Sequence, residues 1–435
     1  MTTINGSQIQ PPPRLLHRIV AVERHEIAAL FASFLMFFAL LAAYYIVRPL
    51  RDEMGVTYGK GELHHLFTVV FFVMLAAVPV FGFVASKLPR RLVLPAIYSF
   101  FAACMLGFWL TFKAYGTPPH LAGTFFVWGS VFNLFVISLF WSLMSELWSN
   151  SEAKRLYGFI AAGGTAGAVA GPLITKQLVA TLAPVDLLPV SAALLVVALI
   201  MSLALRKLRP GAADHEAEPA GGGILDGAAK VISSPYFGRI ALFILLANVV
   251  GTFFYLEQAR LAADAFATSA ERVNFFTSRD LIVSIATLTI EVFGTAAVMR
   301  YLGLTVALAA LPVMATIGTL AITYQPLLWV VAAAMVGERV IAFSLSSPAI
   351  KVMYTLAAAD EKYKVQSFVD TVVYRGGDAA AGWVFALIGG SLGFAAAAVP
   401  LVALPLTALW FWNARELGSA YQAKVQEGAG KAQGL

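Results

Sequence analysis

Apolar stretches of membrane-spanning length are the feature that most limits what this chain can fold into. The first, at 27–47, holds no charged residue over twenty-one positions and would cross roughly 30 Å of hydrocarbon as an α-helix. Eleven more are expected near 66–86, 92–112, 121–145, 158–180, 188–205, 237–259, 279–298, 303–323, 327–350, 366–390 and 394–413. Because 60% of the 435 residues are apolar and only 12% are charged, we predict an all-α polytopic membrane protein with about twelve transmembrane helices.

A segment rich in proline, glycine and charge interrupts these stretches in the middle of the chain. It runs from 206 to 235 and includes Pro210, Pro219 and three consecutive glycines, which is typical of a flexible linker. The expected organisation is a tail at 1–26, a six-helix half at 27–205, this linker, a second six-helix half at 236–413 and a tail at 414–435. Two halves of six helices are typical of the major facilitator architecture, in which the substrate sits between the halves.

Lysine and arginine are unevenly distributed between the two sides of the predicted helices. Twenty fall on the side that holds both tails and the linker, and eight fall on the opposite side. Since basic residues accumulate on the cytoplasmic side, both termini are expected in the cytoplasm. The net charge of +6 therefore reflects topology and gives no reason to expect nucleic-acid binding.

Charge becomes dense directly after the first apolar stretch, in the sequence YYIVRPLRDEMG at 44–55. At helical spacing Tyr44, Arg48 and Arg51 fall on one face, and Pro49 is expected to kink or break the helix. One interpretation is the polar end of a span, with arginine side chains that reach the lipid headgroups. The other is an anion-contacting helix end facing a water-filled cavity, because the guanidinium fork matches phosphate and carboxylate geometry.

Charged side chains inside the later stretches are further candidates for a substrate site. Glu338 and Arg339 lie about twelve residues into one predicted span. Asp370, Arg375 and Asp378 lie together in another. Charges at that depth pair with one another and mark transport pathways, although a purely structural ion pair would fit the same pattern. An interfacial or capping position would also explain the remaining charges near the ends of spans, which are Glu146, Glu257, Arg260, Arg279 and Asp280.

Glycine recurs every fourth residue in the fifth stretch, at Gly163, Gly167 and Gly171. No strand precedes the segment and no Gly-Lys-Ser/Thr follows it, which excludes a phosphate-binding loop. Close packing of two helices through a groove of small residues is expected instead.

Two adjacent histidines, His64 and His65, lie near a predicted membrane surface. Neighbouring residues do not share one helical face, so both are interpreted as solvated or interfacial side chains rather than metal ligands. Neither a metal site nor a cofactor is expected.

Three blocks of the sequence resemble the ATP:ADP antiporter, or nucleotide translocase, family, and the chain is similar to a short bacterial member. The blocks are YYIVRPLRDEMG at 44–55, SELWSNSEAKRLYGFIAAGG at 145–164 and KYKVQSFVDTVVYRGGDAAAGW at 362–383. Arg51 stands where members of that family carry lysine. The resemblance implies that Arg51, Glu146 and the cluster from Asp370 to Asp378 line the transport path.

The predicted function is alternating-access transport of an anionic, phosphate-bearing metabolite, with nucleotide exchange as the version that the resemblance implies. The candidate cations would attract the substrate, and the candidate carboxylates would pair with them in the empty site. The alternatives are proton-coupled symport or export of another small metabolite, and a membrane receptor or enzyme. We expect no enzymatic activity, because the sequence lacks a nucleophile-and-base arrangement, and we expect a monomer in the lipid bilayer.

Overall fold

The computed structural model describes residues 22–59, 61–87, 89–209, 224–357, 359–391 and 398–433. These residues are almost entirely helical, and nine helices among them are long and apolar enough to cross a membrane. The all-α polytopic fold class predicted from the sequence is therefore confirmed. The expected tail up to residue 21 and the central part of the expected linker, 210–223, lie outside the described residues.

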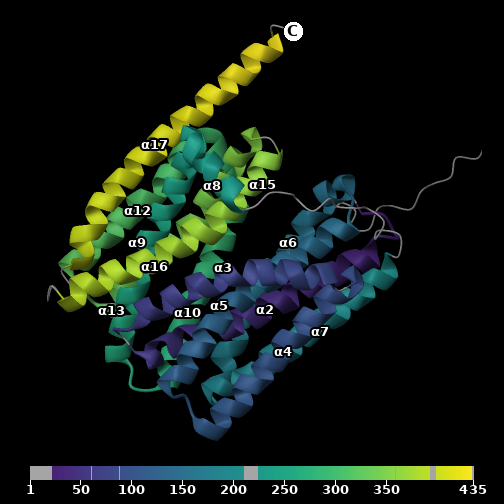
Figure 1. Cartoon of the computed structure of the whole chain (residues 1–435), viewed down its shortest axis with the longest axis vertical. Helices are drawn as coiled ribbons and strands as arrows, with labels where there is room; N and C mark the ends of the chain where they lie inside the picture. Colours follow the sequence, from purple (N-terminus) through teal and green to yellow (C-terminus); the bar gives the residue numbers. More distant parts are fainter. Residues whose placement is uncertain are drawn as a thin grey trace, which may run out of the picture.

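The first six helices form one bundle, drawn from purple to blue in Figure 1. They are α2 (Ile27–Tyr58), α3 (Leu63–Lys87), α4 (Arg90–Tyr115), α5 (Pro119–Leu147), α6 (Asn150–Leu178) and α7 (Leu187–Leu208), with a short 3₁₀ turn, η1 (Pro184–Asp186), before α7. Helix α2 is central and packs on α5, α6 and α7. Its side chains from Leu30 to Leu50 are therefore mostly buried.

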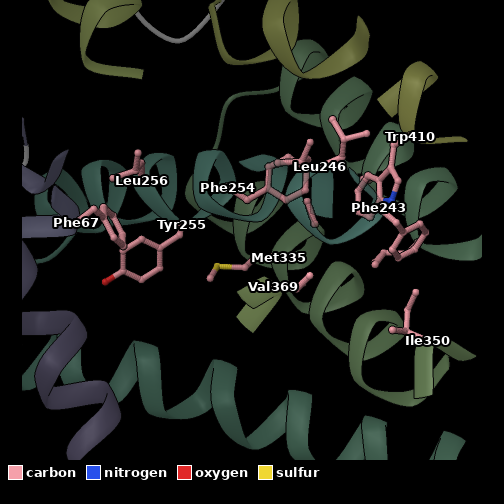
Figure 2. Close-up of a cluster of buried hydrophobic side chains, with 14 of the residues drawn as sticks. Phe67, Phe243, Leu246, Phe254, Tyr255, Leu256, Met335, Ile350, Val369 and Trp410 are labelled. Atoms are coloured by element: carbon pink, nitrogen blue, oxygen red, sulfur yellow. The ribbon is translucent and has the colours of Figure 1, made fainter. Parts of the chain in front are cut away.

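The later helices form a second bundle, drawn from green to yellow in Figure 1. Its elements are α8 (Ile224–Ser233), α9 (Pro235–Ala265), α10 (Ser269–Phe293), α11 (Thr295–Ala297), η3 (Val298–Leu302), α12 (Leu304–Tyr324), α13 (Leu328–Ile341), η4 (Ala342–Ser346), α14 (Ser347–Met353), η5 (Tyr354–Leu356), α15 (Ala359–Phe368), η6 (Val369–Val373), α16 (Tyr374–Ala386), η7 (Leu387–Ser391) and α17 (Ala398–Gln433). Figure 2 shows part of its apolar core, where Phe243 of α9 packs against Trp410 of α17 with ring centroids 5.5 Å apart.

The helices of both bundles share two opposite ends, the linker end and the far end. The linker end is the one at which α7 stops and α9 starts, and the far end is the one at which α2 stops. Two segments outside the predicted spans are helical at the linker end. The last residues of the predicted linker form the amphipathic helix α8, which packs on α15, and α17 continues through the predicted tail to Gln433.

Helix α6 packs against α2 through its glycines, as the sequence predicts. A Cβ atom on Gly163 would lie 2.4 Å from the carbonyl oxygen of Phe34, and one on Gly167 would lie 2.3 Å from that of Phe38. A Cβ on Gly171 would meet the carbonyl oxygen of Ala42 at 2.8 Å. The two backbones are therefore too close for any side chain at these positions, which confirms the small-residue groove.

Helix α2 does not break at Pro49, and this prediction of a break is wrong. The helix continues to Tyr58, eleven residues beyond the expected end of the span at Val47. Proline removes one backbone hydrogen bond to the preceding turn, but both sides of the residue are buried against neighbouring helices and hold the chain in place. The charged residues after Val47 are consequently carried inside the bundle.

Four of the described elements of the second bundle are π-helical, namely η3, η4, η6 and η7, and two of them lie directly between α-helices. One is η4, between α13 and α14, and the other is η6, between α15 and α16. Such turns are frequently found at functional sites. Both turns contribute side chains to a cavity between the two bundles.

The two bundles meet mainly through three pairs of helices, which are α3 with α16, α10 with α2, and α10 with α6. On the α3 side, Trp383 donates a hydrogen bond from its Nε1 to Thr68 Oγ1 at 2.9 Å. A Cβ on Gly382 would lie 3.1 Å from the Cα of His64. These residues lie toward the far end of their helices, so the bundles touch closely there.

Candidate functional site

The cavity between the two bundles has a volume of about 420 Å³. Its wall comes from α2, α3 and α5 on one side and from α9, α12, α13, η4, α14, η5, α15, η6 and α16 on the other. The structure brings eight of the eleven predicted site residues to this wall, namely Tyr44, Arg48, Arg51, Glu338, Arg339, Asp370, Arg375 and Asp378. The described lining contains neither histidine nor cysteine, and its chemistry is that of arginine, lysine, carboxylate, hydroxyl and amide groups.

Arg51 lies between α2 and α5 rather than at a membrane surface. Its Nε donates a hydrogen bond to Ser130 Oγ at 3.1 Å, and its guanidinium carbon lies 4.0 Å from the centre of the Phe126 ring. The side chain is 17% exposed and faces the cavity. Arg48 is more deeply buried, at 7%. The interpretation of these arginines as snorkelling side chains is therefore wrong, because α2 extends well past them.

A buried network of ion pairs joins α2 to α10 at the far end of the cavity. Arg279 Nη2 lies 2.7 Å from Asp52 Oδ2 and 2.8 Å from Asp280 Oδ1. Arg48 Nε lies 3.5 Å from Asp280 Oδ2, and Tyr255 donates from its hydroxyl to Asp52 Oδ1 at 3.2 Å. All five residues are under 9% exposed. Because breaking a buried pair leaves an uncompensated charge, this network holds the two bundles together.

Two further contacts extend the closure of the far end. Arg272 Nη2 lies 2.9 Å from Glu53 Oε1, again between α10 and α2. Figure 2 shows Phe67 of α3 beside Tyr255 of α9, with ring centroids 5.8 Å apart. The cavity is therefore shut from the far end by charged and aromatic groups of both bundles.

The structure corrects the interpretation of Arg279 and Asp280 as capping residues. Helix α10 begins at Ser269, ten residues before the expected start of this span, and its capping box consists of Thr268 and Glu271. Arg279 and Asp280 thus fall three turns inside the helix, where they face α2. The capping box, a threonine followed by glutamate three residues later, is the sequence signal that could have placed this start.

At the linker end the cavity is open. Lys351 of α14 and Asp370 of η6 line it and are both exposed. Their charges lie close enough to interact. An anion entering from the linker end would meet this lysine before it reached the arginines further in.

Asp378 is held by polar groups of α9 on the second bundle's side of the cavity. Its Oδ1 accepts hydrogen bonds from Asn248 Nδ2 at 2.9 Å and from Thr252 Oγ1 at 2.7 Å, and Arg375 Nη1 lies 3.3 Å from its Oδ2. Arg375 and Asp378 are three residues apart in the sequence and thus meet across one helical turn. Asn248 and Thr252 were not among the predicted site residues, because an uncharged polar residue in an apolar span also fits simple helix packing.

Glu338 and Arg339 are neighbouring charged residues of α13 on the cavity wall. The Nε of Arg339 is buried without a hydrogen-bond partner among the described residues. Glu338 is 7% exposed, and its Oε1 would lie 3.4 Å from a Cβ on Gly251. Buried charged groups are normally hydrogen-bonded, so Arg339, a residue of the cavity wall, keeps an unused donor.

The remaining three predicted residues do not reach the cavity. Glu146 lies 3.6 Å from Arg206 at the linker end of the first bundle. Glu257 and Arg260 pair with each other at 2.5 Å on the last turns of α9. They are one turn apart on α9, which accounts for that pairing.

Comparison with known proteins finds matching folds but no matching sequence family. Neither a protein-family model nor a curated protein sequence matches the chain. The solved structure of the nucleoside transporter NupG is similar with a TM-score of 0.64 and 15% identity, covering 93% of this chain and 99% of that chain. A bacterial homologue of the iron transporter ferroportin, in an inward-facing state, gives a TM-score of 0.65 and 14% identity over 91% of this chain and 99% of that chain.

A third similar structure is a POT family transporter in complex with 5-aminolevulinic acid, with a TM-score of 0.61 and 12% identity over 89% of this chain and 96% of that chain. At such low identity the likeness establishes the fold and not the substrate. The chain therefore shares the fold of these three solved structures.

Proposed function

We propose that this protein is an alternating-access transporter of an anionic, phosphate-bearing metabolite, with nucleotide exchange as the specific version. The observation that carries the proposal is the unpartnered Nε of Arg339 on the wall of a cavity between two helical bundles. A buried guanidinium donor without a partner is costly, and a phosphate or carboxylate oxygen would satisfy it.

The charge of the cavity wall supports an anionic substrate. Five cationic side chains line it, and four carboxylates accompany them. The cations are Arg48, Arg51, Arg339, Lys351 and Arg375, and the carboxylates are Asp52, Glu338, Asp370 and Asp378. The volume of about 420 Å³ falls within the roughly 300–1,000 Å³ typical of small-molecule sites.

The proposed cycle uses competition between the substrate and protein carboxylates for the same arginines. In the empty site Arg375 contacts Asp378, and Arg51 lies 3.5 Å from Asp52. A bound phosphate would draw these guanidinium groups away from their carboxylates. Loss of the Asp52 contact would weaken the network that shuts the far end, so that substrate binding favours the opposite opening.

The two helical halves, at 27–205 and 236–413, are proposed to move against each other about this cavity, with the segment at 206–235 joining them. We place the linker end on the cytoplasmic side of a bacterial inner membrane, because lysine and arginine are concentrated at that end. In that orientation the structure is open to the cytoplasm. The test is a cysteine placed at Ala220 in a Cys104→Ser background, which a membrane-impermeant maleimide added to intact cells should leave unlabelled; labelling would refute the orientation.

The substrate proposal is tested by uptake into proteoliposomes. Labelled ATP, ADP and simple phosphate esters would be offered with and without the same compound inside, because exchange requires an internal counter-substrate. Arg339→Ala should lower uptake at subsaturating concentration by about tenfold or more, the loss expected for one charge-assisted hydrogen bond. Arg300→Ala is the matched control, since Arg300 is exposed on η3 and does not line the cavity. Equal uptake by both variants would overturn the assignment of Arg339.

Proton-coupled symport is the second candidate, and Glu338 is the observation that favours it. Its carboxylate is buried beside the cavity, and intramembrane carboxylates of this kind serve as proton relays. An imposed pH gradient should then drive accumulation in wild-type proteoliposomes but not in Glu338→Gln proteoliposomes. Uptake that requires internal counter-substrate and is unaffected by the pH gradient would instead support exchange.

A further inference from the structure

Three side chains with metal-binding atoms gather at the far end of α3, outside the cavity. They are Glu62, which directly precedes the helix, and His64 and His65 in its first turn. One ligand atom from each lies within 4.8 Å of the other two. None of the three lines the cavity between the bundles, so the cluster is separate from the proposed substrate site.

The local geometry explains how adjacent histidines come together. Their ring centroids are 4.0 Å apart with the planes tilted by 40°. Adjacent residues point in different directions along a regular helix, but here the rings lean toward each other beside Glu62, whose Oε2 is 3.1 Å from His65 Nε2. The sequence-based argument against a shared ligand position therefore does not hold for these residues.

The second bundle covers one side of the cluster. Trp383 of α16 packs edge-on against the His64 ring at 4.5 Å and against the His65 ring at 5.3 Å, measured between ring centroids. Its own Nε1 is fixed by a hydrogen bond to Thr68 Oγ1. His64 is consequently 9% exposed, whereas Glu62 and His65 are exposed and accessible.

A backbone carbonyl orients His64 for ligation. Its Nδ1 lies 3.1 Å from the carbonyl oxygen of Gly61, a contact in which Nδ1 carries the hydrogen. The other ring nitrogen, Nε2, is then the one with a free lone pair. Metal-ligating histidines commonly donate their second nitrogen to a carbonyl or carboxylate in this way.

We propose that Glu62, His64 and His65 bind one divalent zinc ion at the far end of the transporter. Two imidazoles and one carboxylate are a known tetrahedral ligand set for Zn²⁺, which leaves the fourth position to water. Ligand atoms at about 2.0–2.1 Å from a tetrahedral zinc are roughly 3.3 Å from one another. The three ligand atoms would therefore need to move inward by only small side-chain rotations.

The first measurement is isothermal titration of the untagged full-length protein in detergent with ZnCl₂. We expect one ion per chain. His65→Ala should weaken binding by about a hundredfold because it removes one ligand, and Glu62→Gln by about tenfold because a neutral amide replaces the charged carboxylate. His120→Ala is the control, since His120 is an exposed histidine at the start of α5 that the cluster does not include. Both cluster variants change exposed side chains, so their size-exclusion profiles should match that of the wild type.

The second measurement locates the ion relative to Trp383. Cu²⁺ binds such sites more tightly than Zn²⁺ and quenches a tryptophan in contact with its ligands. The quenched fraction should disappear in Trp383→Phe, and it should also disappear when Zn²⁺ is added first. Zinc binding unchanged in His65→Ala, or lost in His120→Ala, would overturn the site, as would Cu²⁺ quenching that persists in Trp383→Phe. These outcomes are independent of whether the protein carries nucleotides.

Discussion

Replacement of Gly167 by alanine tests the contact that positions α2, the helix that carries Arg48 and Arg51 into the cavity. A Cβ at this position would lie 2.3 Å from the carbonyl oxygen of Phe38 and 3.0 Å from the backbone nitrogen of Ala42. Ordinary van der Waals contact begins at about 3.4 Å, so α6 would have to withdraw from α2 by about 1 Å. Both neighbouring atoms belong to the backbone, so no side chain can rotate away to make room.

The same helix offers a control for this substitution. Gly158 also lies in α6, and no atom lies within 4 Å of a Cβ at that position. Alanine gains up to about 1 kcal/mol over glycine in a helix interior, and this gain applies equally at both positions. The difference between the two variants therefore isolates the clash, which we expect to cost about 1–3 kcal/mol, as overpacking of a well-packed interior does.

The assay is equilibrium unfolding by sodium dodecyl sulfate in mixed micelles, followed by tryptophan fluorescence. Gly158→Ala should unfold at the same or a higher detergent fraction than wild type, and Gly167→Ala at a lower one. Gly167→Leu should weaken packing further and reduce transport with it, because α2 would be displaced along with its arginines. Identical stability of the two alanine variants, or a fully active leucine variant at wild-type expression, would refute the close-packing argument.

Three other outcomes are expected. Arg51→Ala should weaken substrate affinity about ten- to hundredfold, the loss of a charge-assisted hydrogen bond, and Arg51→Lys should recover part of it; half-saturation measurements that match wild type would remove Arg51 from the site. Asp52→Asn breaks the 2.7 Å ion pair with Arg279 and should loosen the far end. A cysteine placed at position 133 should then react several-fold faster with maleimide added from the far side. An unchanged rate would show that the network does not hold the far end shut. Glu152 lies outside the span that begins at Arg155. Burial raises the pKa of Glu152, but hydrogen bonds from Arg209 and Ser149 outweigh this effect and hold the pKa at about 2. This pKa is below the usual value of about 4.3, so the charged carboxylate stabilises the folded state at pH values above about 4.3. The excess free energy of unfolding of wild type over Glu152→Gln should therefore shrink as the pH falls from about 4 to about 2. A difference in free energy of unfolding that does not depend on pH would contradict this reasoning.

The helices were predictable because apolar length is a strong signal in a membrane, where backbone hydrogen bonds must be satisfied within the segment. The expected span at 303–323 and α12 at Leu304–Tyr324 agree closely. The glycine spacing of α6 was equally informative, since small residues four apart on an apolar helix strongly favour close contact with a neighbouring helix.

The ends of spans that carry buried charge were not predictable in the same way. The sequence after Val47 looks like the end of a span because Arg48 and Asp52 are charged. Their partners, Asp280 for Arg48 and Arg279 for Asp52, are more than two hundred residues away. Tertiary pairing of this kind leaves no local pattern. The uncharged members of the site, such as Asn248 and Thr252, were missed for a related reason: their importance comes from Asp378, on a different helix.

The two π-helical turns that line the cavity, η4 and η6, affect which side chains its wall can present. A π turn closes its hydrogen bond from residue i to i+5 and so holds one residue more than an α turn. Each residue of an α-helix advances by about 100° around the axis. Conversion of η4 to α-helical bonding would therefore rotate the neighbouring residues by about 100° around the helix axis. Phe343 and Ser346, which line the cavity there, would then be replaced on the wall by side chains that now face elsewhere. The wall on this side can thus change the groups it presents through the register of a single turn, while the helix axes and the paired charges at the far end stay where they are.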